Sequence, residues 1–185
     1  MEKEIYLVLT QTSSSLSRAI KVVTGQQFNH ISISLSPALD PMFSFGRRHP
    51  YNPFWGGFVK EYIWKGTFYR FPETKCQVLK LPVTAEQYEK IQTFLEEMYA
   101  NKDNYGYNFV GLCLAAFQHN RASDNKFYCS EFIKALFLEF QIEGAESLPD
   151  ITHPCDFLNF PGVESVYVGR LQDYPAGQRV ASGVK

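Results

Sequence analysis

The chain has 185 residues, of which 45% are hydrophobic, 16% aromatic and 20% charged, and its formal net charge is −1. This composition is typical of a globular protein with enough apolar material for a sizeable core. Proteins that bind nucleic acids normally carry a basic face or block. The sequence has none, so we expect no nucleic-acid partner.

The initial segment, MEKEIYLVLTQ, lacks the positive region and long apolar core of a secretory signal. No run of the sequence approaches the roughly 18 apolar residues of a membrane-spanning helix. We therefore expect a cytoplasmic protein without stable membrane insertion.

Four cysteines, Cys76, Cys113, Cys129 and Cys155, occur at irregular spacings and form no CxxC pair. In a reducing compartment they are expected to be free thiols. The segment THPC brings His153 close to Cys155, but two such residues do not make a zinc site. The sequence therefore predicts no metal site and no cofactor.

Short apolar runs and turn residues divide the first half of the chain into predicted elements. The serines at 13–15 offer N-caps for a helix that ends at Gly25. Pro, Gly and Asn are frequent in residues 50–57, which we predict to be a loop. The predicted strands cover residues 4–11, 28–35 and 42–48, with further strands in 58–71 and 75–83.

Polar and apolar residues alternate strictly in FNHISISL, residues 28–35. Successive side chains of a strand point to opposite faces. One face is expected to carry Ile31, Ile33 and Leu35. The other is expected to carry Phe28, His30, Ser32 and Ser34. The first set suits a core, and the second suits a cleft.

The second half of the chain contains more predicted helix. Thr84 and Gln87 form a capping box that opens one helix, and Pro154 is typical of the first turn of another. Helices are predicted from 84 onward and within 104–118, 126–140 and 147–160, and a last strand within 164–171.

These elements show no regular alternation of strand and helix. They predict an α+β fold in which an antiparallel sheet packs against helices. We find no internal repeat and no linker, so we expect one catalytic domain over residues 1–173 and a flexible tail over 174–185.

Cys129 is the main candidate for a functional residue. It lies in the expected first turn of the helix over 126–140, where unpaired N–H groups and the helix dipole favour a thiolate. A nucleophilic cysteine needs a general base, most often histidine. His30 is the best candidate, because it lies on the polar face of its strand. His49, His119 and His153 remain alternatives.

A third group should accept a hydrogen bond from the other imidazole nitrogen. Ser44 lies on the neighbouring predicted strand and is positioned to face the same cleft, with Asp40 and Glu61 as alternatives. The backbone N–H of Cys129 is a natural donor to an oxyanion, because amides in the first turn of a helix are unpaired.

The segments FNHISISL and FYCSEFI together resemble the circularly permuted branch of the NlpC-type papain-like cysteine hydrolases. This branch includes YiiX-like bacterial proteins and, more distantly, lecithin:retinol acyltransferase. It places the His strand before the Cys helix, as this chain does. The Tyr-Cys-Ser-Glu signature at 128–131 is the most specific part, and the resemblance covers residues 4–170.

The resemblance implies a papain-like antiparallel sheet or small barrel packed against helices. It implies Cys129 as nucleophile, His30 as base, Ser44 as orienting residue and Tyr128 as a substrate-binding group. Many relatives have Glu, His or Asn at the third position, so Ser44 is a departure. The implied activity is that of an amidase, peptidase or acyltransferase that cleaves an amide or ester through a thioester intermediate.

The implied substrate is a small, lipid-like, N-acyl or peptide molecule, and the acceptor of the acyl group and the oligomeric state stay open. Aromatic residues in 52–58 and 62–71 are candidates for lining an apolar groove, with surface or core packing as the alternative. A different class of function, a non-catalytic module that binds lipid or peptide, is the second hypothesis. It rests on the weak hydrogen-bonding strength of Ser44.

Overall fold

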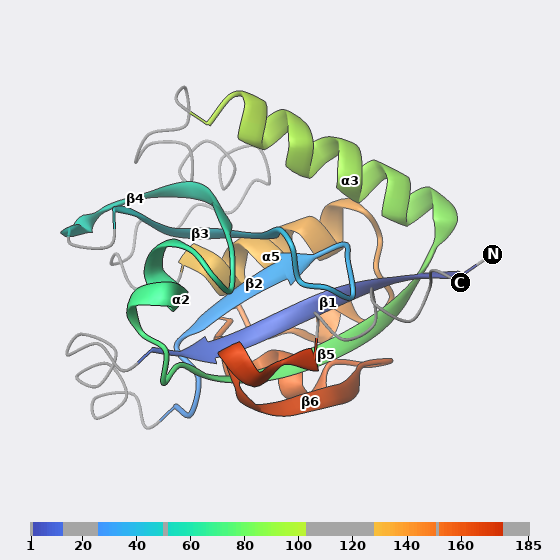
Figure 1. Ribbon diagram of the computed structural model, residues 1–185. Helices are drawn as coiled ribbons and strands as arrows, with labels where there is room; N and C mark the ends of the chain where they lie inside the picture. Colours follow the sequence, from blue (N-terminus) through green and yellow to red (C-terminus); the bar gives the residue numbers. More distant parts are fainter. Residues whose placement is uncertain (1, 13–25, 50–51, 103–127, 151, 176–185) are drawn as a thin grey trace, which may run out of the picture.

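The structure is a computed structural model of the chain, and it describes residues 2–12, 26–49, 52–102, 128–150 and 152–175 (Figure 1). Six strands form one sheet in the order β4-β3-β2-β1-β5-β6, and every neighbouring pair is antiparallel. The strands are β1 Glu2–Gln11, β2 His30–Ser34, β3 Met42–His49, β4 Asn52–Glu61, β5 Lys75–Thr84 and β6 Glu164–Arg170.

Both faces of the sheet are covered, because the central strands carry apolar residues on both sides. Ile5, Leu7 and Leu9 of β1 belong to the larger core cluster, together with residues of helices α3 (Ala85–Ala100) and α5 (Tyr128–Glu139). The alternate β1 residues Tyr6 and Val8 belong to a second cluster on the other face. There the short helix α2 (Gly66–Arg70) inserts Phe68. Figure 1 shows α5 behind the sheet and α2 in front of it. The expected α+β fold with an antiparallel sheet is confirmed.

Local signals account for several element boundaries. The capping box that opens α3 is present: the amide of Gln87 donates to Thr84 Oγ1 at 3.1 Å, and the amide of Thr84 donates to Gln87 Oε1 at 2.9 Å. Pro154 starts the 3₁₀ helix η2 (Pro154–Asn159), where its missing N–H costs nothing. These two predictions are confirmed.

The predicted loop at 50–57 is wrong where the structure describes it. The backbone from Asn52 onward belongs to β4 and pairs with β3, with Gly57 opposite Gly46 and Phe58 opposite Phe45. Pairing with a neighbouring strand overrides the turn preference of Pro, Gly and Asn, because strand propensity depends strongly on context.

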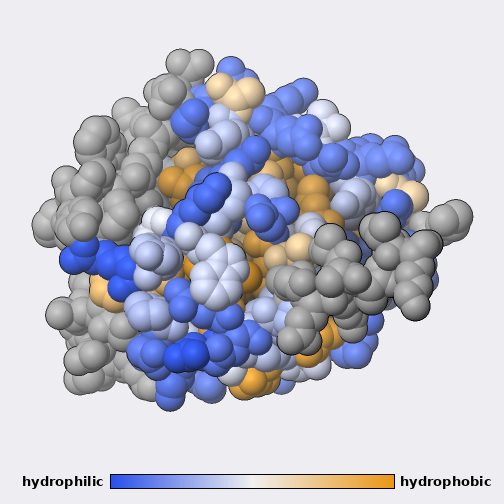
Figure 2. Space-filling view, viewed as in Figure 1, coloured by the Kyte–Doolittle hydropathy of each residue, from blue (hydrophilic) through white to orange (hydrophobic). Residues whose placement is uncertain are grey.

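The strand prediction for 58–71 is right only as far as Glu61. Gly66 adopts a φ of 60°, and the chain then turns into α2 instead of extending. The aromatic residues of this segment divide between core and surface: Phe58 and Phe68 are buried, whereas Trp64 and Tyr69 are exposed. Figure 2 shows hydrophobic residues at the surface between hydrophilic ones on one face of the molecule.

The predicted alternation of residues 28–35 holds from His30 to Leu35, which packs against the larger cluster as Ile31 and Ile33 do. The strand begins at His30, so Phe28 precedes the ladder and packs into the larger cluster with Ile31 and Ile33. Ser32 and Ser34 keep the opposite face, but both are fully buried.

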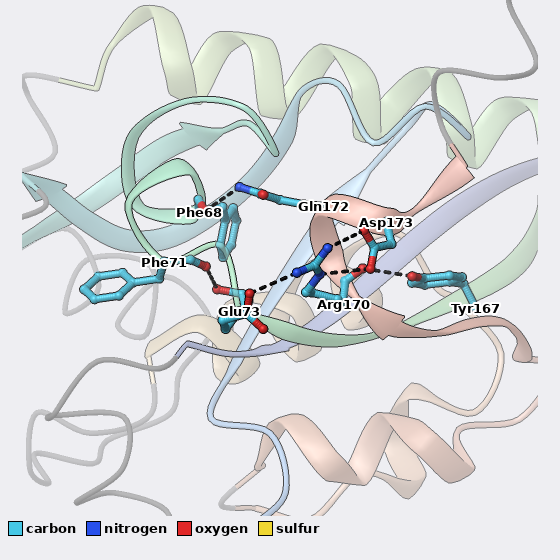
Figure 3. A network of polar contacts seen from close by, with 8 residues as sticks. Phe68, Phe71, Glu73, Tyr167, Arg170, Gln172 and Asp173 are labelled. Atoms are coloured by element: carbon cyan, nitrogen blue, oxygen red, sulfur yellow. Dashed lines mark hydrogen bonds and ion pairs between the residues drawn. The ribbon is translucent and has the colours of Figure 1, made fainter.

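A polar network closes the second face near the end of β6 (Figure 3). The Arg170 guanidinium donates to Glu73 Oε1 at 2.9 Å and to both carboxylate oxygens of Asp173. The side-chain amide of Gln172 donates to the carbonyl of Phe68 at 3.3 Å. These contacts join β6, the segment before β5, and α2. Tyr174, where the predicted tail begins, donates to the carbonyl of Pro37 at 2.9 Å.

The helices predicted after Ser13 and within 104–118 lie outside the described residues, as does most of the predicted tail. Among the helices that the structure describes, none combines the length and apolar character needed to cross a bilayer.

Candidate functional site

The candidate site lies where strand β3 leaves strand β2. The ladder between them contains the pairs Ile33–Phe43 and Ser34–Met42. The first three residues of β2, which include His30 and Ser32, therefore lie beyond the β3 ladder. On its other edge β3 pairs with β4, and Glu61 lies opposite Met42 in that ladder. The space next to the start of β2 is thus open to side chains from other strands.

Glu61 fills this space with its carboxylate. Oε2 of Glu61 accepts a hydrogen bond from Ser32 Oγ at 2.6 Å and another from Ser44 Oγ at 2.8 Å. His30 Nε2 lies 3.0 Å from Oε2 and 3.2 Å from Oε1. Three strands therefore contribute to one polar cluster, which consists of His30, Ser32, Ser44 and Glu61.

The cluster is nearly closed to solvent. The side chains of His30 and Glu61 are 18% and 13% exposed, and both serines are fully buried. Charges in such a site interact more strongly than on an open surface, because little water screens them.

The charges of the cluster are coupled. Burial by itself lowers the pKa of His30, but the Glu61 carboxylate and the Cys129 side chain outweigh it, so the pKa lies well above its usual value. Burial raises the pKa of Glu61, and His30 with the two serine hydroxyls overcomes this effect and lowers it. At neutral pH the pair is therefore an imidazolium facing a carboxylate.

Cys129 is the second residue of α5 and is 9% exposed. It belongs to the larger core cluster, on the side of the sheet that α5 covers. Its side chain nevertheless acts on His30, because it is among the groups that raise the pKa of the imidazole.

Packing fixes the direction of α5. The ring of Phe132 makes edge contacts with the rings of Phe45 and Phe58, with centroids 5.2 and 5.4 Å apart. Ser130 Oγ donates to the carbonyl of Thr152 at 2.6 Å, and Lys134 Nζ donates to the carbonyl of Pro149 at 2.8 Å. The first turn of the helix is thus held from both sides.

The other described cysteines have different surroundings. Cys76 is buried in the second cluster, and burial raises its pKa to about 12, so it stays a thiol at neutral pH. Cys155 Sγ donates to the carbonyl of Phe28 at 3.8 Å. All three described cysteines are free, and Cys113 lies outside the described residues.

Cys129 acts on the pKa of His30, and Ser44 occupies a different place from the one expected for an orienting residue. The Ser44 hydroxyl bonds to Glu61, and it is Glu61, one of the two alternatives, that contacts the imidazole. Asp40, the other alternative, is an exposed residue in the turn before β3. Ser32 was expected on the same face as His30 but without a role.

The remaining candidates do not enter this cluster in the described part of the chain. His153 is the N-cap of η2, where its amide donates to Asp156 Oδ2 at 2.7 Å. Tyr128 opens α5, but its side chain and that of His49 lie outside the description, as does His119. No group of three or more His, Cys, Asp or Glu side chains that could hold a metal occurs among the described residues.

No family model, curated protein or solved structure matches the chain. The function is therefore inferred from the geometry of this cluster and from the sequence motifs.

Proposed function

We propose that the protein is a cysteine hydrolase or acyltransferase that cleaves an amide or ester through a thioester on Cys129. The observation that carries this proposal is that the imidazole of His30 lies 3.0 Å from the Glu61 carboxylate and has its pKa raised by both Glu61 and Cys129. A nucleophile, a base and an anion that orients the base are the three parts of a triad.

In the proposed reaction, Cys129 and His30 form a thiolate–imidazolium pair. The sulfur attacks the substrate carbonyl and forms the C–S bond. The resulting oxyanion accepts from the Cys129 amide, which lies in the first turn of α5. His30 then gives its proton to the leaving amine or alcohol as that bond breaks, and a thioester remains.

The second half returns the enzyme to its starting state. His30 takes a proton from water, or from another acceptor, which attacks the thioester. The C–S bond breaks and the sulfur leaves as thiolate beside the imidazolium. Glu61 supports the positive charge on His30 in both halves, since its carboxylate lies 3.0 Å from Nε2.

Glu61 takes the place of Ser44 as the orienting residue in this proposal. A carboxylate is a stronger acceptor than a hydroxyl and carries the charge that an imidazolium needs. The second hypothesis, a non-catalytic binding module, rests on Ser44 being that residue. The contact between Glu61 and His30 therefore favours the enzyme.

The finer fold assignment is also part of the proposal: a papain-like domain of the circularly permuted NlpC type. It is supported by the His strand preceding the Cys helix, by α5 packing on the sheet beside that strand, and by the Tyr-Cys-Ser-Glu signature at 128–131. A lipid-like, N-acyl or peptide substrate, a substrate contact by Tyr128 and a cytoplasmic location remain proposals from the sequence.

Hydrolysis of p-nitrophenyl esters of different chain length tests the activity. We expect release of p-nitrophenol by the wild-type protein, its loss in Cys129→Ala, and little change in Cys155→Ala, a thiol outside the cluster. Mass spectrometry should find the acyl group on Cys129 in a stopped reaction. Turnover that persists in Cys129→Ala, or none with any ester, would overturn the proposal.

A further inference from the structure

One oxygen of Glu61 receives most of the hydrogen bonds in the cluster. Oε2 accepts from Ser32 at 2.6 Å and from Ser44 at 2.8 Å, and it lies 3.0 Å from His30 Nε2. Oε1 lies 3.2 Å from the same nitrogen. The two serines come from different strands, β2 and β3, and Glu61 comes from a third, β4.

We propose that Ser32 and Ser44 are positioning residues that together hold the Glu61 carboxylate in one orientation against His30. The proposal rests on the proposed function for its catalytic meaning. Its structural content, that two hydroxyls fix an anion, is independent of any activity.

A glutamate side chain has several rotamers, which would otherwise allow the Glu61 carboxylate to turn away from the imidazole. A hydroxyl that donates to a carboxylate makes a short, charge-assisted bond. Both serines are fully buried, so water does not compete for these bonds. With two donors on Oε2 from two strands, the carboxylate keeps one plane and one distance to Nε2.

Gly46 supplies the space for this arrangement. A Cβ atom built on Gly46 would lie 3.2 Å from Ser44 Oγ and 3.3 Å from Glu61 Oε1, closer than ordinary van der Waals contact. A methyl group at Gly46 would therefore crowd both the Ser44 hydroxyl and the Glu61 carboxylate.

The electrostatic consequence has a definite sign. Ser32, Ser44 and the His30 imidazole each act to lower the pKa of Glu61, against the effect of burial. Cys129, which belongs to α5, acts to raise the pKa of His30. Removing one hydroxyl should raise the pKa of Glu61, because the anion loses a donor that the protonated acid does not need.

The test is a carboxyl and imidazole NMR titration of the substrate-free protein, with Ser32→Ala and Ser44→Ala compared with wild type. We expect the apparent pKa of Glu61 to move to higher pH in each variant and further in the double variant. Ser34→Ala is the matched control. Ser34 is equally buried on the same strand face, but it donates to the carbonyl of Pro41 at 2.8 Å and does not touch Glu61. Ser32→Thr, which keeps a hydroxyl, should restore the wild-type value.

Unchanged titration of Glu61 in both alanine variants would overturn the proposal, as would an equal shift in Ser34→Ala. If a variant does not fold, the other serine and the threonine variant still decide the question. The p-nitrophenyl ester assay separates the two proposals. If the wild-type protein is inactive but shows the expected NMR shifts, the proposed function alone is rejected. If the protein is active and the acid limb of its activity–pH profile is the same in all variants, the positioning role alone is rejected.

Discussion

His30 Nε2 and Glu61 Oε2 lie 3.0 Å apart, although the residues are 31 positions apart and belong to strands that do not neighbour each other in the sheet. The contact exists because the ladder between β2 and β3 ends at Ile33, while β3 stays paired with β4, the strand that contains Glu61. A largely buried carboxylate then meets a largely buried imidazole.

Glu61→Gln should lower the pKa of His30. The carboxylate charge raises this pKa against the effect of burial, so a neutral amide of the same shape removes the largest effect that favours the imidazolium. We expect the alkaline limb of the activity profile, and the imidazole NMR titration, to move to lower pH. Glu164→Gln, which removes an exposed carboxylate paired with Lys80, serves as the control. A His30 titration that is the same in both variants would contradict the account.

The same pair should make the stability of the protein depend on pH. The raised pKa of His30 contributes stability that is full below about pH 6.5 and is lost as pH rises through the folded-state pKa. The lowered pKa of Glu61 contributes stability that is present above about pH 4.3 and is lost as pH falls through its folded-state value. The destabilisation caused by Glu61→Gln should thus be largest between these two values.

Urea unfolding at several pH values measures this difference. For a pair that keeps some contact with solvent, we expect about 2 kcal/mol at the maximum. A difference in the free energy of unfolding that stays constant from pH 4 to pH 9 would show that the pair is not ionised as described.

Thr10→Val should stabilise the protein. Thr10 pairs with His30 in the β1–β2 ladder, and its Oγ1 is the buried side-chain polar atom without a hydrogen-bond partner among the described residues. Valine has the same shape and no group to satisfy, so we expect the free energy of unfolding to rise by about 1 kcal/mol. Thr10→Ser, which keeps the hydroxyl and loses the methyl group, should lower it. A destabilised valine variant would mean that the hydroxyl has a partner.

The sequence predicts the fold well where local signals and burial agree. The capping box at Thr84, the Pro154 helix start and the strand β5 follow from residues within one turn or one strand of each other. The segment 52–61 is a strand because β3 pairs with it, which its own Pro, Gly and Asn residues do not indicate. Phe28 leaves the predicted alternation because the strand starts two residues later.

For the candidate site, the sequence indicates the residues more readily than their connections. His30 and Cys129 stand out by strand parity and helix position, and Cys129 is among the groups that raise the pKa of His30. Ser44 and Glu61 are both candidates for the third residue, but only the β3–β4 register shows that one contacts the imidazole and the other contacts the carboxylate. The alternation that placed Ser32 beside His30 is the signal that could have assigned it to the cluster.

Phe132→Leu should disturb the position of Cys129 more than the stability of the domain. The ring of Phe132 packs against Phe45 and Phe58 one turn after Cys129. Leucine keeps most of the apolar volume, so we expect a loss of about 1 kcal/mol in the free energy of unfolding, together with slower alkylation of Cys129. Phe157→Leu, in a 3₁₀ helix of the same core, is the control: it should cost similar stability and leave the alkylation rate unchanged. Equal alkylation rates in the two variants would contradict this role of Phe132.

The central claim is that His30, oriented by Glu61, activates Cys129. The most direct test is the rate at which iodoacetamide alkylates each cysteine of the native protein at neutral pH, mapped by mass spectrometry after short exposures. We expect Cys129 to react fastest, Cys76 to react very slowly because burial raises its pKa to about 12, and the Cys129 rate alone to fall in His30→Gln. If Cys129 reacts no faster than Cys155, or if its rate is unchanged in His30→Gln, the account is contradicted.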